Sequence, residues 1–499
     1  MRNLSKIVFL LISSTFVHAH VGSPDVYYEG DAGPYHLFVT VRLPKVIPGA
    51  GEIEVRSASP DVQSVQAVLL HLTGLGSTLP PAPSVAQRSK DDPQFFVGNL
   101  WFREFGALQV RIEVDGSKGK AELSVPVASF ARQSLSMDRG LRGIFAFFFV
   151  FLTLSVVPIA GALVRESGAA PGTVPLGSNR RLSRIVMVMA LIVAVAVLQL
   201  NRSWWNAQAA TYARTVNILK QPQAETTLLN GNRLVIRPVG RLVFPRLNGK
   251  DREVKMDELI PDHGHLMHLF LIASPGMQRL WHLHPDPDKS GAFATTLPAM
   301  PPGQYQVFAD ILDKTGFPWT LVGKIDLPQI NGPATGGDDS AWTGSPLAIP
   351  LSGTTVAQLP DGARIVWERG NASINADVAA GLNFRVEAKD GTLARDLEPY
   401  MGMAAHAEVV RSDLSVFAHI HPAGTVPMAA LSLAQAGKTT QPSASASHEM
   451  TMQMPHSHSS LPPDFSFAYG FPHPGDYRIF VQIKRSGQVQ TVVFDAHVQ

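Results

Sequence analysis

The chain contains no cysteine among its 499 residues. This absence excludes disulfides, thiolate zinc sites, iron–sulfur clusters and cysteine nucleophiles. Charge is also scarce: charged residues make up 16% of the chain, and 42 Lys and Arg against 40 Asp and Glu leave a formal net charge of +2. A nearly neutral chain gives no reason to expect nucleic acid as a partner. Any metal site must be built from His, Met and carboxylates.

The sequence also lacks the motifs of common enzyme classes. It has no Walker loop, no Gly-x-Ser-x-Gly elbow and no Gly-x-Gly-x-x-Gly after a predicted strand. His-x-His pairs occur in cupin-type oxygenases and amidohydrolases, but no Glu follows His284 at the cupin offset, and no barrel-length run of strands and helices exists. We therefore expect no enzymatic activity.

Residues 1–19 are typical of a secretory signal peptide. Arg2 and Lys6 precede an apolar run, which ends in the small residue Ala19 at a suitable cleavage position. The mature chain would then begin at His20. An uncleaved anchor helix is the alternative.

Two further apolar stretches predict transmembrane helices at residues 143–164 and 185–202. The first has 22 residues, enough to span about 30 Å of hydrocarbon, and the second runs into the interfacial pair Trp204-Trp205. The loop at 165–184 carries four Arg against one Glu and is predicted to be cytoplasmic. We therefore predict a bacterial inner-membrane protein. Its periplasmic parts are residues 20–132 and all residues after a juxtamembrane connector at 203–223. Two buried core helices are the alternative.

The outer parts of the chain are predicted to be strands. Apolar and polar residues alternate with period two at residues 35–42, 52–56, 108–114 and 121–125, between Gly, Pro and Asp turns. At this length the pattern predicts a small antiparallel β-sandwich over residues 20–132.

The rest of the chain contains an internal repeat. Shared landmarks occur in one order in both copies: Pro261, Gly264 and His268 match Pro399, Gly402 and His406; a His-x-His-Pro motif starts at His282 and His419; a Pro-Gly-x-Tyr-x-x-Phe motif starts at Pro302 and Pro474. These landmarks predict two β-sandwich domains at 224–332 and 350–499, joined by a linker at 333–349. The second copy carries an insertion at about 424–463.

The histidines are concentrated in these repeats, where 13 of the 17 lie between His263 and His497. Residues i and i+2 of a strand share a face, and the single His of the preceding strand reaches the pair through a hairpin. Three imidazoles are thus predicted to meet at one end of each sandwich, a ligand set suited to Cu, Zn or Ni. The two predicted sets are His268, His282 and His284, and His406, His419 and His421.

Two methionines of the second copy stand where the first has histidines. Met401 and Met403 align with His263 and His265. Copper accepts both imidazole and thioether, whereas zinc seldom binds Met, so the exchange favours copper. The alternative is that both methionines fill a loop or core gap and that each His pair is structural.

Two further candidate sites lie outside these strands. The insertion alternates three His and three Met in a polar tract, where thioethers can capture Cu(I) and imidazoles Cu(II): His448, Met450, Met452, Met454, His456 and His458. At the mature N-terminus His20 would offer its α-amine and imidazole to one metal, completed by Asp25, His36 or His71. The alternatives are a solvated low-complexity loop and a frayed terminus.

Residues 33–41 and 47–49, together with the His-x-His-Pro and Pro-Gly-x-Tyr-x-x-Phe landmarks, resemble bacterial periplasmic modules of the YtkA-like and FixH-like type. The resemblance touches all three outer domains and leaves out the two apolar spans. It implies small immunoglobulin-like β-sandwiches in envelope proteins, some of them associated with copper handling or oxidase maturation.

Together these features predict a mainly β protein with three immunoglobulin-like β-sandwich domains outside the membrane and two transmembrane helices. The expected function is copper handling by binding, resistance or delivery, with zinc as the less favoured metal. The expected partners are the lipid bilayer, a metal ion and another periplasmic or membrane protein. The alternative is an envelope protein that displays sandwich domains for protein contacts and has no metal role.

Overall fold

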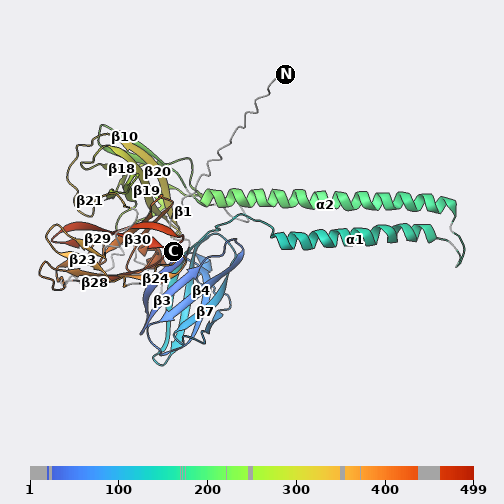
Figure 1. The fold of residues 1–499 in the computed structure, drawn as a ribbon, viewed down its shortest axis with the longest axis horizontal. Coiled ribbons are helices and arrows are strands. Elements are labelled where there is room, and N and C mark those ends of the chain that lie inside the picture. The colour runs from blue at the N-terminus through green and yellow to red at the C-terminus, as the bar shows by residue number, and fades with distance from the viewer. Residues whose placement is uncertain are drawn as a thin grey trace, which may run out of the picture. The chain divides into compact units, whose positions relative to one another are not determined.

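The computed structural model describes residues 20–21, 25–168, 170, 172–174, 176–220, 222–244, 251–348, 355–370, 372–436 and 461–499. The protein is mainly β, with several sheets, as predicted. It divides into two compact units (Figure 1): residues 132–217 form a helical unit, and the rest of the described chain forms a β-rich unit.

The helical unit is a pair of long helices, α1 (Arg139–Glu166) and α2 (Gly177–Lys220), which run side by side (Figure 1). Asp138 caps α1 by accepting hydrogen bonds from the backbone N–H groups of Gly140 and Leu141. The helices approach closely at Gly161, whose carbonyl accepts a 2.6 Å hydrogen bond from the Ser183 hydroxyl.

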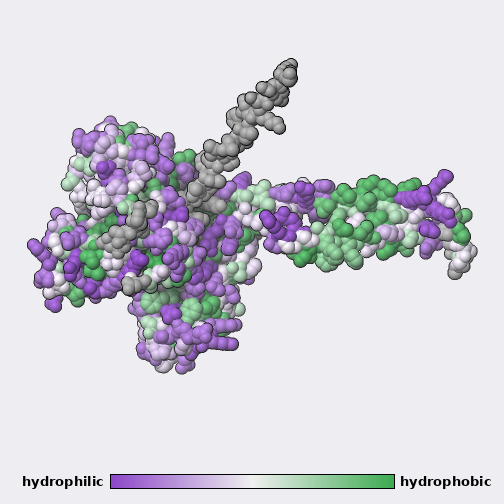
Figure 2. Space-filling model, in the orientation of Figure 1, coloured by the Kyte–Doolittle hydropathy of each residue, from purple (hydrophilic) through white to green (hydrophobic). Residues whose placement is uncertain are grey.

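Both helices are long and apolar enough to cross a membrane. Their most apolar 18-residue windows have mean hydropathies of 2.4 and 2.3, and Figure 2 shows hydrophobic residues gathered along the middle of both. Helix α1 contains the predicted 143–164. Helix α2 is much longer than the predicted 185–202 and takes in most of the predicted connector, because residues 203–220 contain neither Gly nor Pro to end it.

The N-terminal domain is a set of eight antiparallel strands in the order β2-β3-β4-β7-β6-β5-β8-β9. Strand β3 matches the predicted 35–42 at both ends, and its alternate side chains are buried in the domain core, as period two requires. The strands are β2 (Val26–Ala32), β3 (Tyr35–Arg42), β4 (Gly49–Ser57), β5 (Val62–His71), β6 (Ser84–Arg88), β7 (Phe95–Phe102), β8 (Gly106–Gly116) and β9 (Gly119–Ser129).

Repeat 1 consists of a four-stranded and a six-stranded sheet, with a short β-ribbon beside them. The four-stranded sheet is β10 (Ala224–Leu229), β11 (Arg233–Pro238), β18 (Phe293–Thr296) and β17 (Asp286–Pro287). The six-stranded sheet is β14 (Leu259–Ile260), β19 (Gly303–Asp313), β15 (His268–Ser274), β16 (Arg279–Leu283) and β21 (Ser340–Thr343), with β20 (Pro318–Leu327) beside β19. The ribbon is β12 (Val243–Phe244) and β13 (Arg252–Glu253).

Repeat 2 also consists of a four-stranded and a six-stranded sheet. The smaller is β22 (Val356–Gln358), β23 (Arg364–Trp367), β24 (Ala379–Glu387) and β28 (Asp464–Gly470). The larger is β1 (His20–Val21), β27 (Val416–Ile420), β26 (His406–Arg411), β29 (Gly475–Arg485) and β25 (Leu397–Glu398), with β30 (Gln488–Val498) beside β29.

The structure explains one shared landmark, corrects the predicted linker and adds a helix to the predicted insertion. The hydroxyls of Tyr305 and Tyr477 each donate a 2.7 Å hydrogen bond to the carbonyl four residues earlier, so the Pro-Gly-x-Tyr motif is structural. The predicted linker is not a free connector, because it supplies edge strand β21 to repeat 1. The insertion of repeat 2 includes a helix that the sequence pattern did not predict, α3 (Met428–Ala436).

The two repeats pack against each other through their six-stranded sheets. Phe270, Ile272 and Phe308 of repeat 1 form one buried cluster with Phe417 and Phe480 of repeat 2, and the rings of Phe308 and Phe417 stack 4.2 Å apart. Every residue of β15 except the last is buried, so this sheet is covered on both faces. The predicted histidine strands therefore lie between the repeats.

Candidate metal centre

Eight histidines converge at one end of the interface between the repeats. Each ring centroid lies within 5.0 Å of at least one other. Repeat 1 supplies five of the rings and repeat 2 supplies three: His263, His265, His268, His282, His284, His406, His419 and His421.

Hairpin register brings the strand histidines together. In β15 and β16, Leu269 pairs with Leu283, which places His268 beside His284, and His282 lies opposite Phe270. In β26 and β27 the register is the same, with Ala407 opposite Ile420. The two predicted hairpins and the shared face of each His-x-His pair are therefore confirmed.

The first trio consists of His268, His282 and His284, whose candidate ligand atoms lie within 4.8 Å of one another. Each ring has one nitrogen 3.0–3.1 Å from an oxygen acceptor: the Asp262 carbonyl, the Gln482 side chain and the Asp339 carboxylate respectively. Because these oxygens accept, that nitrogen carries the proton and the other presents a lone pair. The lone-pair nitrogens of His268 and His282 face each other at 3.2 Å.

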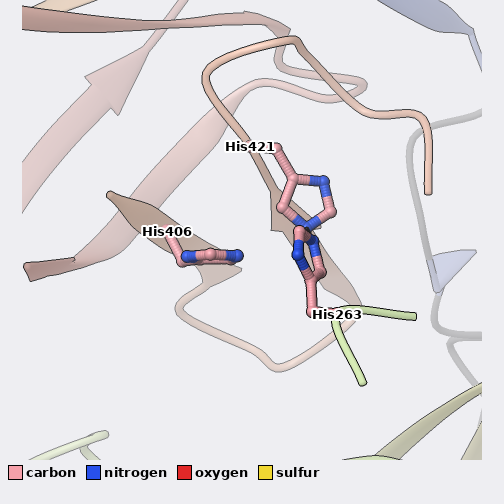
Figure 3. A group of neighbouring side chains, drawn as sticks. All are labelled: His263, His406 and His421. Carbon is pink, nitrogen blue, oxygen red and sulfur yellow. Dashed lines mark hydrogen bonds between the residues drawn. The ribbon is translucent and has the colours of Figure 1, made fainter. Parts of the chain in front are cut away.

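The second trio, His263, His406 and His421, is built in the same way but from both repeats (Figure 3). His263 Nδ1 donates to the Met401 carbonyl at 2.7 Å, and His421 Nδ1 donates to the Val426 carbonyl at 3.3 Å. Their Nε2 atoms are left as lone pairs that face each other at 3.2 Å. Both nitrogens of His406 are buried without a hydrogen-bond partner.

His263 reaches the other repeat from a tight turn. Backbone hydrogen bonds join Asp262 and His265, and both central residues have positive φ, 52° at His263 and 87° at Gly264. The aligned turn of repeat 2 is identical in form, with φ of 49° at Met401 and 81° at Gly402. Met401 takes part in the site through its backbone carbonyl, and Met403 through the backbone pair that closes its turn.

His419 lies between the trios. Its ring centroid is 4.7 Å from that of His421 and 5.4 Å from that of His268. The sequence predicts His419 as a member of the second trio, but His263 occupies that place in the structure. The Nδ1 of His419 lies 3.8 Å from Asp310, while its buried Nε2 has no partner. Strand pairing places Glu408 opposite His419.

The environment keeps the imidazoles uncharged. Burial, followed by the proximity of other histidines, holds the pKa of His268, His282, His406 and His419 well below the usual value. The same causes lower the pKa of His421 to about 3. Neutral imidazole is the form that binds metals.

Two carboxyl groups, the buried Glu408 and the partly exposed Asp310, complete the surroundings. Burial raises the pKa of Asp310 to about 7 and that of Glu408 well above its usual value. Both Glu408 oxygens lack a hydrogen-bond partner, and one lies 3.8 Å from His282 Nδ1. Unpaired buried polar atoms each cost about 1–3 kcal/mol, so this concentration of them is destabilising in the metal-free chain.

The open edge of the cluster is formed by His265 and the linker. The His265 ring stacks on His284 at 3.9 Å, and its side chain is 30% exposed. Its Nε2 lies 3.5 Å from Asp338, which also contacts Lys484. His265 is therefore a partly exposed histidine at the edge of the first trio.

The N-terminal domain fixes the loop that follows His421. Strand β2 pairs with this loop: Glu29 N–H donates to the Ala423 carbonyl and Thr425 N–H donates to the Tyr27 carbonyl. A Cβ on Gly424 would lie 2.0 Å from the Tyr27 carbonyl oxygen. The sequence carries no signal for this contact, because the partners are almost 400 residues apart.

The other predicted ligands fall elsewhere. The backbone of His20 pairs with Val416 in β1, but its side chain lies outside the described part of the chain. His36 contacts Asp31 and Glu29, and His71 contacts Glu104, so both have carboxylate partners. The predicted loop site lies wholly outside the described residues: His448, Met450, Met452, Met454, His456 and His458.

Comparisons with known proteins assign no function to this site. Residues 355–499, which form repeat 2, match a family described as a domain of unknown function (DUF8832). No curated protein matches the chain.

Among solved structures, the tetra-tandem repeat of a large adhesion protein is 8% identical, over 92% of this chain and 73% of that one, with a TM-score of 0.16. Alpha-2-macroglobulins of Salmonella and E. coli are 10% and 8% identical, over 97% and 96% of this chain, with TM-scores of 0.19 and 0.20. The chain spans 24% and 23% of these two proteins. TM-scores this low do not indicate a shared overall fold.

Proposed function

We propose that this chain is a membrane-anchored metal-binding protein of the bacterial periplasm that handles copper. In this proposal α1 and α2 cross the inner membrane after signal-peptide cleavage, and the β-rich domains are immunoglobulin-like sandwiches on the periplasmic side. The proposal concerns binding, storage or delivery of the metal rather than catalysis.

One observation carries the proposal. In each trio two imidazole nitrogens that bear lone pairs face each other at 3.2 Å. Two lone pairs at this distance repel each other, and a cation between them converts the repulsion into two ligand bonds.

Copper is the best-supported metal. Imidazole binds Cu(II), Zn and Ni, and Cu(II) has the highest affinity for such nitrogen ligands. The absence of Cys and the six His and Met residues within 448–458 add to this preference.

The test is metal titration of the full chain purified in detergent, with Cu(II) and Zn(II) measured separately. We expect binding tighter than micromolar and preferentially of copper. His263→Asn and His284→Gln should each weaken binding at least tenfold, while His497→Gln, at an exposed histidine paired with Asp476, should not. Absence of micromolar binding of either metal would overturn the proposal and leave the display of sandwich domains as the function.

A further inference from the structure

We infer that the two trios form one binuclear centre, in which two metal ions interact and His419 supplies a ligand in the space between them. This inference rests on the proposed metal-binding function. It extends that function because two separate mononuclear sites would satisfy the proposal equally well.

The first argument is that each trio is complete as a metal site. Both contain three imidazoles with converging nitrogens. All three rings of the first trio, and His263 and His421 of the second, have one nitrogen hydrogen-bonded to an oxygen outside the trio. Such outer hydrogen bonds orient metal-binding histidines and increase their basicity. Two such arrangements provide positions for two ions.

The second argument is that the rings of the two trios lie close together. The rings of His263 and His268, one from each trio, have centroids 6.2 Å apart and meet edge to face. Metal–nitrogen bonds of about 2 Å on either side of these rings place two bound ions within roughly 13 Å of each other.

His419 occupies the space between the two positions. Its centroid lies 5.4 Å from His268 in the first trio and 5.6 Å from His406 in the second. Its buried Nε2 has no hydrogen-bond partner, so its lone pair is available to an ion.

The charge balance fits two cations. Glu408 and Asp310 lie beside the cluster, 3.8 Å from His282 Nδ1 and His419 Nδ1 respectively. Strand pairing relates these contacts: Asp310 lies opposite His268, and Glu408 lies opposite His419. Ionised carboxylates would offset part of the positive charge of two ions, which a site made only of imidazoles would leave uncompensated.

The experiment is titration of the metal-free full chain with Cu(II) alone, followed by metal analysis and electron paramagnetic resonance. We expect two Cu(II) per chain and a signal broadened by dipolar interaction at two equivalents. His263→Asn, at a positive-φ position that Asn tolerates, should bind one Cu(II) and give a sharp mononuclear signal. His284→Gln should do the same for the other trio, and His497→Gln should match the unaltered chain.

Other outcomes distinguish failure of this inference from failure of the proposed function. One Cu(II) per chain, or two with unbroadened, additive signals, would overturn the binuclear centre while leaving metal binding intact. No binding of Cu(II) would overturn the proposed function itself. His419→Gln should weaken binding of the ion that Nε2 ligates, and unchanged affinity for both ions would remove His419 from the centre. Thermal unfolding of each metal-free variant shows that it is folded.

Discussion

The most unusual single residue in the structure is Glu408, a fully buried carboxyl group with no hydrogen-bond partner. The equivalent residue of repeat 1 is Phe270, since these two lie opposite His419 and His282 in the two hairpins. A carboxyl at a position suited to an aromatic ring costs stability unless a cation offsets it. Packing does not explain its presence, whereas under the proposed function the carboxylate would offset the charge of a bound metal ion.

Glu408→Gln should therefore stabilise the metal-free protein near pH 7. Burial raises the pKa of Glu408 well above its usual value, so folding near pH 7 requires proton uptake, a cost that disappears below the usual carboxyl pKa. Denaturant unfolding at pH 7 and pH 4 measures the gain, which should shrink at the lower pH. A variant less stable than the unaltered chain at pH 7 would show that the carboxyl has a partner in solution.

The matching tyrosines provide a second test at the residue scale. Tyr305 and Tyr477 are both fully buried, and both donate to a carbonyl four residues earlier. Tyr305→Phe and Tyr477→Phe should each lower the free energy of unfolding by about 1 kcal/mol, since each removes one buried hydrogen bond. Metal binding should be unchanged, because neither hydroxyl contacts a histidine of the trios. Guanidinium unfolding and copper titration measure the two effects, and lowered copper affinity would contradict a purely structural role.

At the level of elements, the loop after His421 depends on the N-terminal domain. Strand β2 hydrogen-bonds to this loop on both sides of Gly424, which has a φ of 110°. The second trio is thus positioned by three parts of the chain: the turn of repeat 1, the hairpin of repeat 2 and the first strand of the N-terminal domain.

Gly424→Ala should disturb the second trio more than the first. The added methyl group would collide with the Tyr27 carbonyl and push the loop away, which we expect to cost about 1–3 kcal/mol beyond the strain of positive φ alone. Gly487→Ala is the matched control, because its φ is 71° and nothing lies near its Cβ. Copper titration should show one weakened ion in Gly424→Ala and none in Gly487→Ala; equal effects would contradict the positioning role.

The elements of the site were predictable from sequence, but their assembly was not. Period two and the turn at residues 274–276 predict the hairpin that joins His268 to His284, and the repeat predicts its second copy. The exchange of His263 into the second trio depends on how two sheets pack, which a local pattern does not contain. One signal was present: apart from the histidines, β15 is apolar on both faces, as a strand covered on both sides requires.

At the scale of the whole molecule, the repeats are held together by an interface that combines an apolar cluster with the histidines. The aromatic part stabilises the metal-free state, since burying a Phe side chain is worth about 1.5–3 kcal/mol. The histidine part opposes it, because unpaired nitrogens are buried there. Metal binding should therefore stabilise the contact between the repeats, by about 4 kcal/mol when the free metal is 1,000 times its dissociation constant.

The metal-free protein should lose stability as the pH falls from 6.5 towards 4.5. Five buried imidazoles have pKa values lowered by burial, so they take up protons on unfolding: His268, His282, His406, His419 and His421. A group whose pKa is lowered on folding contributes stability above its unfolded pKa and loses it below. Three carboxyl groups with raised pKa oppose this effect: Asp262, Asp310 and Glu408.

The lowered imidazoles outnumber the raised carboxyls, so the unfolded chain should bind more protons and stability should fall as the pH falls over this range. Glu408→Gln removes one opposing carboxyl and should make the fall steeper, even though it stabilises the protein at pH 7. Denaturant unfolding of the metal-free full chain between pH 4.5 and 7 measures both slopes. A flat profile in the unaltered chain would mean that the buried imidazoles take up protons in the folded state, and the facing lone pairs would then not exist as described.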